Sequence, residues 1–363
     1  MRARGVRTMP ENGPGQPAGD GRRGRRRDRR ALLLAAAGLA LTGSVLAGSL
    51  PPGPGHTATG RTGESGQAEH AAHTDDEPVP SAAREECQDG RDPDESYAPA
   101  RIAGPAVSEI RERGQLVVGI DLNSYLWGYR SPQTGDIVGF DIDLVQAIAE
   151  DLLGPRPDIK YLAIPTDQRE RAIQDGTVDM VVRTMSITCD RWERVAFSTA
   201  YFETGQQLLV PANSPIQGFD DSLDGMRVCR ANGSTASKLL DAESHGAQVV
   251  GADNHLDCLV RVQLGLADAL MTDDALAAGH VAQDPSMRLA DEPLTRESYG
   301  VAMNLANTDL VSWVNAVLED YRAPGPDGEP SEWRQSYDRW LARYLYDEET
   351  DPPPAPPLPQ YRD

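Results

Sequence analysis

A run of hydroxyl and guanidinium side chains follows an apolar segment near the middle of the chain. The segment VDMVV, residues 178–182, is typical of a buried strand. Four residues with polar side chains come soon after it: Arg183, Thr184, Ser186 and Arg191. A guanidinium group can grip a carboxylate through two parallel hydrogen bonds, and neighbouring hydroxyl groups can add further ones. We therefore expect a carboxylate-binding site where this strand ends.

Three other segments place polar or aromatic side chains at the ends of predicted strands, where ligands bind in open α/β sheets. They are GIDLNSYLWGY (119–129), RANGSTAS (230–237) and LMTDDA (270–275). Asp273 could accept hydrogen bonds from an ammonium group, and Tyr125 or Trp127 could cover a carbon skeleton. With Arg191 opposite, these groups describe a site that holds both charged ends of a free amino acid. Its further candidate members are Asp121, Tyr125, Trp127, Ser234, Thr235, Thr272 and Asp273.

Each of these candidates also has a purely structural explanation. Arg183 and Arg191 could pair with acids of a strongly acidic protein, since clusters of charge are often structural. Asp273 or Asp274 could cap the helix predicted from DALAAGH; we expect Asp274 to cap it and Asp273 to bind ligand. Asp121 could orient an arginine instead of contacting ligand. The histidines show no metal-binding spacing, so neither a metal nor another cofactor is expected.

The balance of charge limits the classes of partner. The chain has 363 residues and a net charge of −21, although its first thirty residues are rich in arginine. The remainder is therefore strongly acidic, and its mean field repels phosphate groups. We expect no nucleic-acid partner and no binding to anionic lipid.

The N-terminal residues 1–48 resemble an export signal. The basic run RRGRRRDRR precedes an apolar segment, Ala31–Gly48, as the charged and apolar parts of such a signal do. Cleavage near Ala47 and retention as a signal anchor both remain open, and cleavage is slightly favoured because the segment is short for a membrane span. Ser49 stands where a lipoprotein would carry cysteine. We expect an exported protein, either secreted or associated with the cell surface, that is not a lipoprotein by this route.

Composition and periodicity divide the rest of the chain. Residues 49–105 are poor in apolar side chains and are expected to form a disordered linker, and residues 347–363 a disordered proline-rich tail. Between them, strand and helix patterns alternate in two series, which indicates an α/β protein with parallel sheets in two lobes and a ligand cleft between them. The expected limits are 106–209 for lobe 1, 210–298 for lobe 2 and 299–346 for the C-terminal part of lobe 1.

Four cysteines in an exported chain indicate two disulfides. Three pairings are possible. Cys229 and Cys258 lie in neighbouring predicted elements and are expected to pair, which leaves Cys87 to pair with Cys189.

Five segments carry a resemblance to a known family: GFDIDLVQAIA, VDMVVRTMSITCDRWERVAFSTAYF, VCRANGSTAS, DCLVRVQLGLADALMTDDALAAGH and SYDRWLARY. With them, the chain resembles family 3 extracytoplasmic solute-binding proteins of amino-acid ABC transporters. It is most similar to the actinobacterial glutamate/glutamine-binding type, over roughly residues 110–346. The resemblance implies the two-lobe periplasmic-binding-protein fold (type II), with Arg191 on the ligand α-carboxylate and Asp273 on the α-ammonium group. It also implies ligand contacts from Thr184, Ser186, Ser234 and Thr235.

The preference for one amino acid depends on two further arginines. TDQRERAIQDG resembles the segment of acidic-amino-acid binders in which an arginine meets the side-chain carboxylate, which corresponds to Arg169. Arg183 adds a second cation at a position that is small and uncharged in many relatives. Because an unpaired buried guanidinium is costly, glutamate or aspartate is favoured, with glutamine or asparagine as the alternatives.

Three functions remain in competition. The first is delivery of an amino acid to an ABC transporter permease by a monomeric, non-enzymatic protein whose lobes hinge near Gln206–Pro211 and Glu297–Val301. The second is an amino-acid sensor ectodomain that acts through a membrane-bound partner and a kinase. The third, a dehydratase on the same fold, would need a general acid or base in the cleft, and no Ser-His-Asp or Cys-His arrangement is visible.

Overall fold

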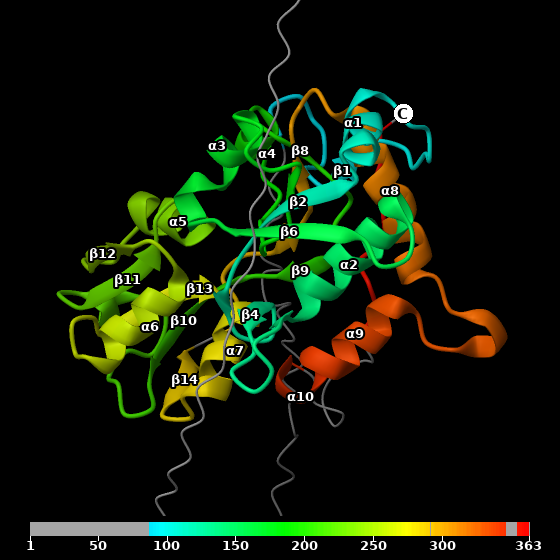
Figure 1. The fold of residues 1–363 in the computed structure, drawn as a ribbon. Helices are drawn as coiled ribbons and strands as arrows, with labels where there is room; N and C mark the ends of the chain where they lie inside the picture. The colour runs from blue at the N-terminus through cyan, green and yellow to red at the C-terminus, as the bar shows by residue number, and fades with distance from the viewer. Residues whose placement is uncertain (1–86, 291, 346–353, 363) are drawn as a thin grey trace, which may run out of the picture. The chain divides into compact units, whose positions relative to one another are not determined.

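The structure is a computed structural model that describes residues 87–290, 292–345 and 354–362 (Figure 1). The predicted export signal and residues 49–86 of the predicted linker lie outside the described residues. Within the described ranges, no helix combines the length and the apolar character that a membrane-spanning segment requires.

Lobe 1 is built on a five-stranded sheet in the order β6-β2-β7-β16-β8. β2 runs parallel to β6 and β7, whereas β16 runs antiparallel to both of its neighbours. The apolar run QLVVGI suits β2 to its place inside the sheet, between β6 and β7, since a strand with layers on both faces must be apolar on both. The strands are β2 (Gln115–Ile120), β6 (Asp158–Ala163), β7 (Met180–Val181), β8 (Ala196–Phe197) and β16 (Ala302–Met303).

Helices and a small second sheet complete lobe 1, and one apolar core runs through it. α2 enters this core with apolar side chains at helical spacing, and it starts beside Trp127 because Gly139 has no Cβ, which would lie 2.2 Å from the Trp127 carbonyl oxygen. The helices are α1 (Pro105–Arg113), α2 (Phe140–Leu153), η1 (Thr166–Gln168), α3 (Arg169–Gln174), α4 (Cys189–Trp192), α8 (Thr308–Arg322), η3 (Pro326–Gly328), α9 (Glu332–Trp340) and α10 (Ala342–Leu345). The small sheet contains β3 (Asn123–Ser124), β4 (Gly128–Arg130) and β5 (Ile137–Val138).

Lobe 2 contains a second five-stranded sheet, in the order β12-β11-β13-β10-β14. β11 is parallel to β12 and β13, and β10 is antiparallel to β13 and β14. α5 covers one face of the sheet, and α6 and α7 cover the other, so that each face has its own apolar core. The elements are β10 (Gln206–Pro211), η2 (Asp221–Leu223), β11 (Arg227–Ala231), α5 (Thr235–Ala242), β12 (Gln248–Ala252), α6 (His255–Gln263), β13 (Ala269–Asp273), α7 (Asp274–Gln283) and β14 (Met287–Ala290).

The two-lobe α/β fold predicted from the sequence is confirmed, but its sheets are mixed and not purely parallel. The antiparallel strands β10 and β16 each follow a passage of the chain between the lobes. The pattern of apolar residues within a strand does not show its direction, so the sequence did not predict that these two strands run antiparallel to their neighbours. The passages are β9 (Phe202–Thr204) and β15 (Glu297–Tyr299), which pair antiparallel. Of the two segments near which a hinge was predicted, Glu297–Val301 includes β15, and Gln206–Pro211 forms β10 of the lobe 2 sheet, which begins two residues after β9 ends.

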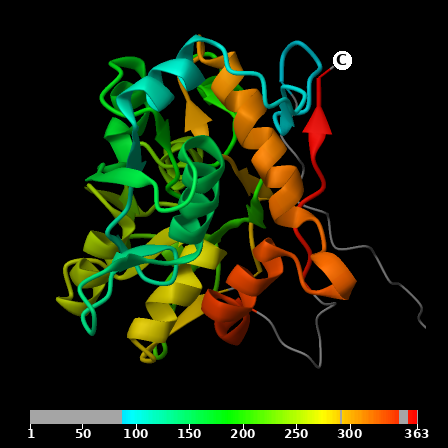
Figure 2. The same ribbon diagram turned by 45° about the vertical axis from the view of Figure 1, so that its right-hand side comes forward.

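Two segments expected to be disordered are packed against lobe 1. Within the predicted linker, β1 (Glu95–Ser96) pairs in parallel with β17 (Gln360–Tyr361) of the predicted tail. Figure 2 shows the C-terminal strand, in red, beside the N-terminal segment, in cyan. Ser96 is buried and donates a hydrogen bond of 2.6 Å to the carbonyl oxygen of Phe197 in β8. Their composition suggested disorder because neither segment has a core of its own; each is held by contacts made far along the chain.

Candidate functional site

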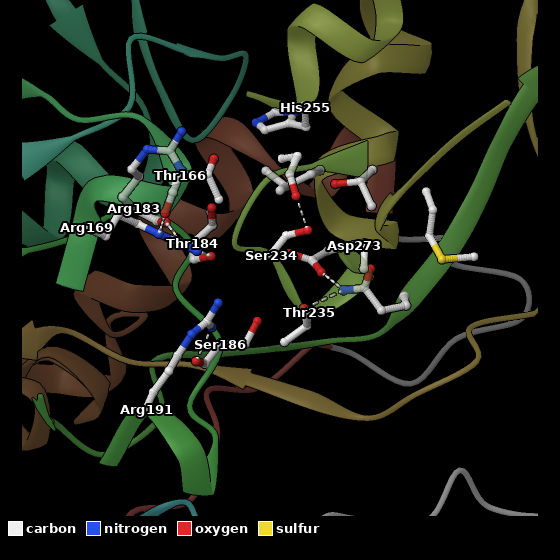
Figure 3. A pocket seen from close by; sticks show the side chains of 16 residues that line it. Thr166, Arg169, Arg183, Thr184, Ser186, Arg191, Ser234, Thr235, His255 and Asp273 are labelled. Carbon is white, nitrogen blue, oxygen red and sulfur yellow. Dashed lines mark hydrogen bonds between the residues drawn. The ribbon is translucent and has the colours of Figure 1, made fainter. Parts of the chain in front are cut away.

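A small cavity lies between the lobes. The centres of water molecules can occupy a volume of about 30 Å³ inside it. Figure 3 shows arginine side chains from lobe 1 facing Ser234, Thr235 and Asp273 of lobe 2 across it. Nine of the twelve residues predicted from the sequence line the cavity: Arg169, Arg183, Thr184, Ser186, Arg191, Ser234, Thr235, Thr272 and Asp273.

Arg191 lies in α4, where the strand-end argument placed it. The hydroxyl of Thr188 caps the start of this short helix by accepting from the Arg191 N–H at 3.3 Å. The guanidinium donates to the Ser186 carbonyl oxygen at 2.6 Å and, across the lobe boundary, to the Gly233 carbonyl oxygen at 3.0 Å. Because it is only 2% exposed and held by neutral carbonyl groups, it can still bind an anion in the cavity.

Arg169 adds a second buried cation to the same wall. Its Nε donates to the Thr166 carbonyl oxygen at 2.9 Å and its Nη1 to the Arg183 carbonyl oxygen at 3.3 Å. Burial, and after it the charges of Arg191 and Arg183, hold the pKa of Arg169 well below its usual range. This wall therefore has an excess of positive charge that an anionic ligand would relieve.

Arg183 forms a close ion pair with a buried acid, whereas Arg169 has no such pair among the described residues and the Nε of Arg191 lies 3.7 Å from Oε1 of the partly exposed Glu170. Its Nη2 lies 2.7 Å from Oδ2 of Asp121 and donates at 2.8 Å to Oδ1 of Asn254 in lobe 2. Burial acts to raise the pKa of Asp121, but the charge of Arg183, the His255 ring and the Asn123 N–H together outweigh it and hold that pKa below its usual value. Asp121 does not line the cavity, so it orients Arg183 and is not a ligand contact.

The lobe 2 wall presents hydroxyl groups at the start of α5. Ser234 caps this helix, because its Oγ accepts from the Ser237 N–H at 3.1 Å. The preceding Gly233 has φ of 73°, and a Cβ there would lie 2.9 Å from Cα of Asp167 in lobe 1. Glycine is thus needed both for the backbone conformation and for the close approach of the lobes.

Asp273 closes the cavity on the lobe 2 side and is 6% exposed. Its Oδ2 accepts from the Tyr299 hydroxyl at 2.5 Å and its Oδ1 from the Gln206 amide. Burial and then the neighbouring charge of Glu297 raise the pKa of Asp273 well above its usual range. The expectation that Asp274 caps α7 is wrong, because Asp273 occupies the N-cap position without a side-chain capping bond and Asp274 is the first residue of the helix, where it accepts from the Ala275 N–H at 2.6 Å and from the Gly205 N–H at 3.2 Å.

The two aromatic candidates do not reach the cavity. Trp127 is 1% exposed and donates its indole N–H to the Ala275 carbonyl oxygen at 3.1 Å, with Phe140 packed against its ring. Tyr125 lies outside the cavity, with its ring centroid 4.9 Å from that of Tyr129. The prediction that either ring covers the ligand is wrong, because the hairpin of β3 and β4 turns Trp127 into the core.

Several cavity residues were missed from the sequence. Thr166 follows β6, so the rule on strand ends would have found it. Gln206 starts β10 directly after a passage between lobes, and His255 starts α6 in lobe 2. The His255 ring contacts Ser124 of lobe 1 at 2.6 Å and His280 at 2.7 Å. The full set that was missed is Thr166, Gln206, Ala231, Ala236, His255, Met271 and Leu276.

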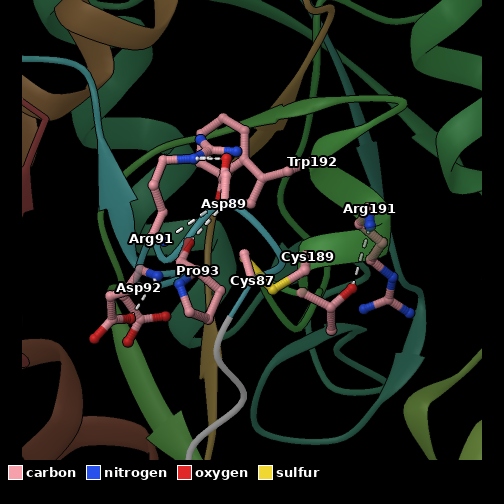
Figure 4. Close-up of a disulfide and its surroundings, with 10 residues drawn as sticks. Cys87, Asp89, Arg91, Asp92, Pro93, Cys189, Arg191 and Trp192 are labelled. Carbon is pink, nitrogen blue, oxygen red and sulfur yellow. Dashed lines mark hydrogen bonds and ion pairs between the residues drawn. A yellow bond between two sulfur atoms is a disulfide. The ribbon is translucent and has the colours of Figure 1, made fainter.

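Both expected disulfides are present: Cys87–Cys189 and Cys229–Cys258. Figure 4 shows Cys189 at the first turn of α4, with the Arg191 side chain extending away from it. The first disulfide therefore ties the N-terminal segment to the helix that carries Arg191. Among the described residues, no cluster of histidine, cysteine, aspartate and glutamate could hold a metal ion.

Comparison with known proteins finds one family model and many relatives. The model described as "Bacterial extracellular solute-binding proteins, family 3" matches residues 116–343. The ABC transporter glutamine-binding protein GlnH of Bacillus subtilis is 31% identical over 235 residues, which cover 65% of this chain and 84% of that protein. The glutamate-binding protein GluB of Corynebacterium efficiens is 32% identical over 225 residues, 59% of this chain and 76% of the relative.

Solved structures show the same fold. A crystal structure of a mutant ArgBP from T. maritima superimposes with a TM-score of 0.60 at 29% sequence identity and covers 66% of this chain and all of that one. These proteins bind different amino acids by name, so similarity alone leaves the ligand of this chain open.

Proposed function

Because this chain belongs to the bacterial extracellular solute-binding proteins of family 3, we propose that it binds a free amino acid outside the cytoplasm and delivers it to an ABC transporter permease. The observation that carries the proposal is that Arg191 and Asp273 line one enclosed cavity from opposite lobes (Figure 3). A molecule that carries both a carboxylate and an ammonium group can bridge them.

The α-carboxylate has several donors on the same side of the cavity. The Arg191 guanidinium supplies a charged fork, and Ser186 of the same wall adds a hydroxyl group. Each carboxylate oxygen of Asp273 accepts one of the bonds from Tyr299 and Gln206 and can accept a second hydrogen bond, from the ammonium group. Buried polar groups of this kind reject ligands that leave them unpaired, which gives selectivity for amino acids.

An acidic side chain fits the remaining part of the cavity best. The Oγ1 of Thr166 and the Nε of Arg183 are buried there without a hydrogen-bond partner. Arg169 adds a positive charge, and burial, followed by the charges of Arg191 and Arg183, already lowers its pKa. A second carboxylate would satisfy these groups, whereas a cationic side chain would be repelled. We therefore favour glutamate or aspartate over glutamine and asparagine, and disfavour arginine.

The described lobes are in contact around the cavity. Arg191 bonds to Gly233, and the Thr166 N–H donates to the Asp253 carbonyl oxygen at 3.2 Å. A ligand would therefore enter when these bonds open by rotation about β9 and β15, and would be enclosed when they re-form.

Isothermal titration calorimetry with glutamate, aspartate, glutamine, asparagine and arginine tests the proposal. Glutamate or aspartate should bind most tightly, and arginine should not bind. An absence of heat for all five up to about millimolar concentration, where binding free energy is only about 4 kcal/mol, would exclude an amino-acid carrier. Co-purification of the permease from membranes, with and without the best ligand, tests delivery separately.

A further inference from the structure

The acid that faces the ligand ammonium group is held by residues at the two passages between the lobes. Tyr299 belongs to β15, and its hydroxyl donates to Oδ2 of Asp273 at 2.5 Å. Gln206 follows the other passage, β9, and its amide donates to Oδ1 of the same carboxylate. Tyr299 therefore ties one oxygen of Asp273 to a passage between the lobes, whereas Gln206, which lies opposite Asp273 in the lobe 2 sheet, holds the other oxygen.

The Tyr299 side chain has little freedom to move. It is fully buried, its ring packs edge-on against Trp127 at 5.5 Å between centroids, and it stacks on Phe202 at 6.1 Å. Its own carbonyl oxygen accepts from the Tyr201 N–H at 2.8 Å. The hydroxyl of Tyr299 is thus held in one position, and its hydrogen bond sets the orientation of the Asp273 carboxylate.

Charged groups act on Asp273 in opposite directions. Glu297 and Asp274 disfavour its charged form, whereas Tyr299 and Gln206 favour it by donating hydrogen bonds. Arg169 and Arg191 face it from the opposite wall and favour the charged form. The groups that act on Asp273 are Tyr299 and Glu297 of β15, Gln206 of β10, Asp274 of α7, Arg169 of α3 and Arg191 of α4.

We propose that Tyr299 is a positioning residue for ammonium binding: its hydroxyl, with the Gln206 amide, aims the Asp273 carboxylate and stabilises its charged form, against the opposing charge of Glu297. The inference rests on the proposed function, because it requires a ligand with a free ammonium group. When such a ligand binds, a protonated Asp273 releases its proton to solvent and pairs with the ammonium ion. Affinity for an amino acid therefore rises with pH over the range in which Asp273 loses its proton, by up to about tenfold per pH unit.

Glutamate affinity measured by calorimetry from about pH 5 to about pH 9 tests the proposal. Tyr299→Phe keeps the ring and removes the donor, so its profile should move to higher pH, and its affinity at neutral pH should fall roughly tenfold or more. Glu297→Gln removes the opposing charge and should move the profile to lower pH. Glutarate, which has both carboxylates but no ammonium group, should lose no affinity in Tyr299→Phe.

Tyr201→Phe is a matched control. Its hydroxyl donates at 2.9 Å to the buried carboxylate of Asp141, an equivalent bond beside the same hinge, but Asp141 does not line the cavity. This variant should lose stability as Tyr299→Phe does, without any shift of the pH profile.

The outcomes separate the two hypotheses. If the wild type binds glutamate and Tyr299→Phe keeps the wild-type profile, Tyr299 does not position Asp273. If Tyr299→Phe does not fold, Glu297→Gln decides: a shift to lower pH supports the inference, and no shift or an upward shift overturns it. If the wild type binds no amino acid at all, the proposed function itself is wrong and this inference falls with it.

Discussion

The two walls of the cavity are held in place in different ways. On the lobe 1 wall, Arg169 and Arg191 are fixed by backbone carbonyl groups, mostly within a few residues of themselves. On the lobe 2 wall, Asp273 is fixed by Gln206 of the same sheet and by Tyr299 of the passage β15. Apart from the Arg191 bond to Gly233, the carbonyl contacts of the arginines depend on the local fold of lobe 1, whereas the support of Asp273 also depends on where β15 lies.

This difference assigns the two walls different tasks. The lobe 1 wall can bind a carboxylate whether or not the lobes are closed. The lobe 2 wall presents an acid whose orientation follows the hinge, and so it can report closure around the ammonium group. Substitutions that remove a charged group from one wall, or a group that holds it in place, should therefore change glutamate affinity by unequal amounts.

Asp273→Asn should give the largest effect on the lobe 2 side. The amide cannot neutralise an ammonium ion, so glutamate affinity should fall about 100-fold or more, as for loss of one partner of a buried charge pair. Asp274→Asn is the matched control, since the asparagine oxygen can still accept from the Gly205 and Ala275 N–H groups and Asp274 does not line the cavity. Equal affinities of the two variants in calorimetry would remove Asp273 from the site.

Arg169→Gln tests the lobe 1 wall for side-chain selectivity. The loss of this cation should weaken glutamate binding more than glutamine binding, and the ratio of the two affinities should fall roughly tenfold. Arg171→Gln, on the same helix, is the control, because Arg171 is 84% exposed and pairs with Asp175. An unchanged glutamate/glutamine ratio in Arg169→Gln would show that the side chain binds elsewhere.

The two disulfides extend the comparison between lobes. Cys87–Cys189 closes 102 residues and holds the start of α4 in lobe 1, whereas Cys229–Cys258 closes 29 residues within lobe 2. Replacing either pair by serine should cost about 3–5 kcal/mol of stability, more for the longer loop. Only the first replacement should also weaken glutamate binding, by several-fold, because it loosens the helix of Arg191. Thermal unfolding and calorimetry measure the two effects, and the same affinity loss in both variants would contradict the assignment.

Asp141→Asn should have the smallest effect, on the pH dependence of stability. Burial raises the pKa of Asp141 to about 7, so the folded protein keeps a proton that the unfolded chain loses near pH 4. Its contribution to the free energy of unfolding therefore falls as pH rises between about 4 and about 7, by about 1 kcal/mol per pH unit. Denaturant unfolding of the variant should show a shallower decline, and an identical decline would place the proton on another group.

Much of the site followed from one rule about strand ends. Thr184, Ser186 and Arg191 follow β7, and Asp273 ends β13, so their strands alone bring them towards the cleft. Trp127 also follows a strand, but an aromatic ring suits a core as well as a pocket, and only the packing of Phe140 decides between them. Local pattern therefore located the charged groups better than the apolar ones.

The missed features depend on contacts between distant parts of the chain. Gln206 enters the cavity because β10 pairs antiparallel with β13 and places Gln206 opposite Asp273, which no spacing within the segment shows. The strand pair of β1 and β17 joins residues from the two ends of the described chain. Their composition alone predicts disorder. The contacts that hold them in place, the Cys87–Cys189 bond and the pairing of β1 with β17, join residues far apart in the sequence and so leave no local pattern.

Titration of glutamate into Arg191→Ala, beside Arg194→Ala, tests most directly whether an amino acid bridges the two walls. Arg194 is a cation of the same segment that pairs with Glu170 and does not line the cavity, so it controls for loss of positive charge. We predict that Arg191→Ala loses about 100-fold or more in affinity while Arg194→Ala stays within about twofold of the wild type. Wild-type affinity in a folded Arg191→Ala protein would contradict the account.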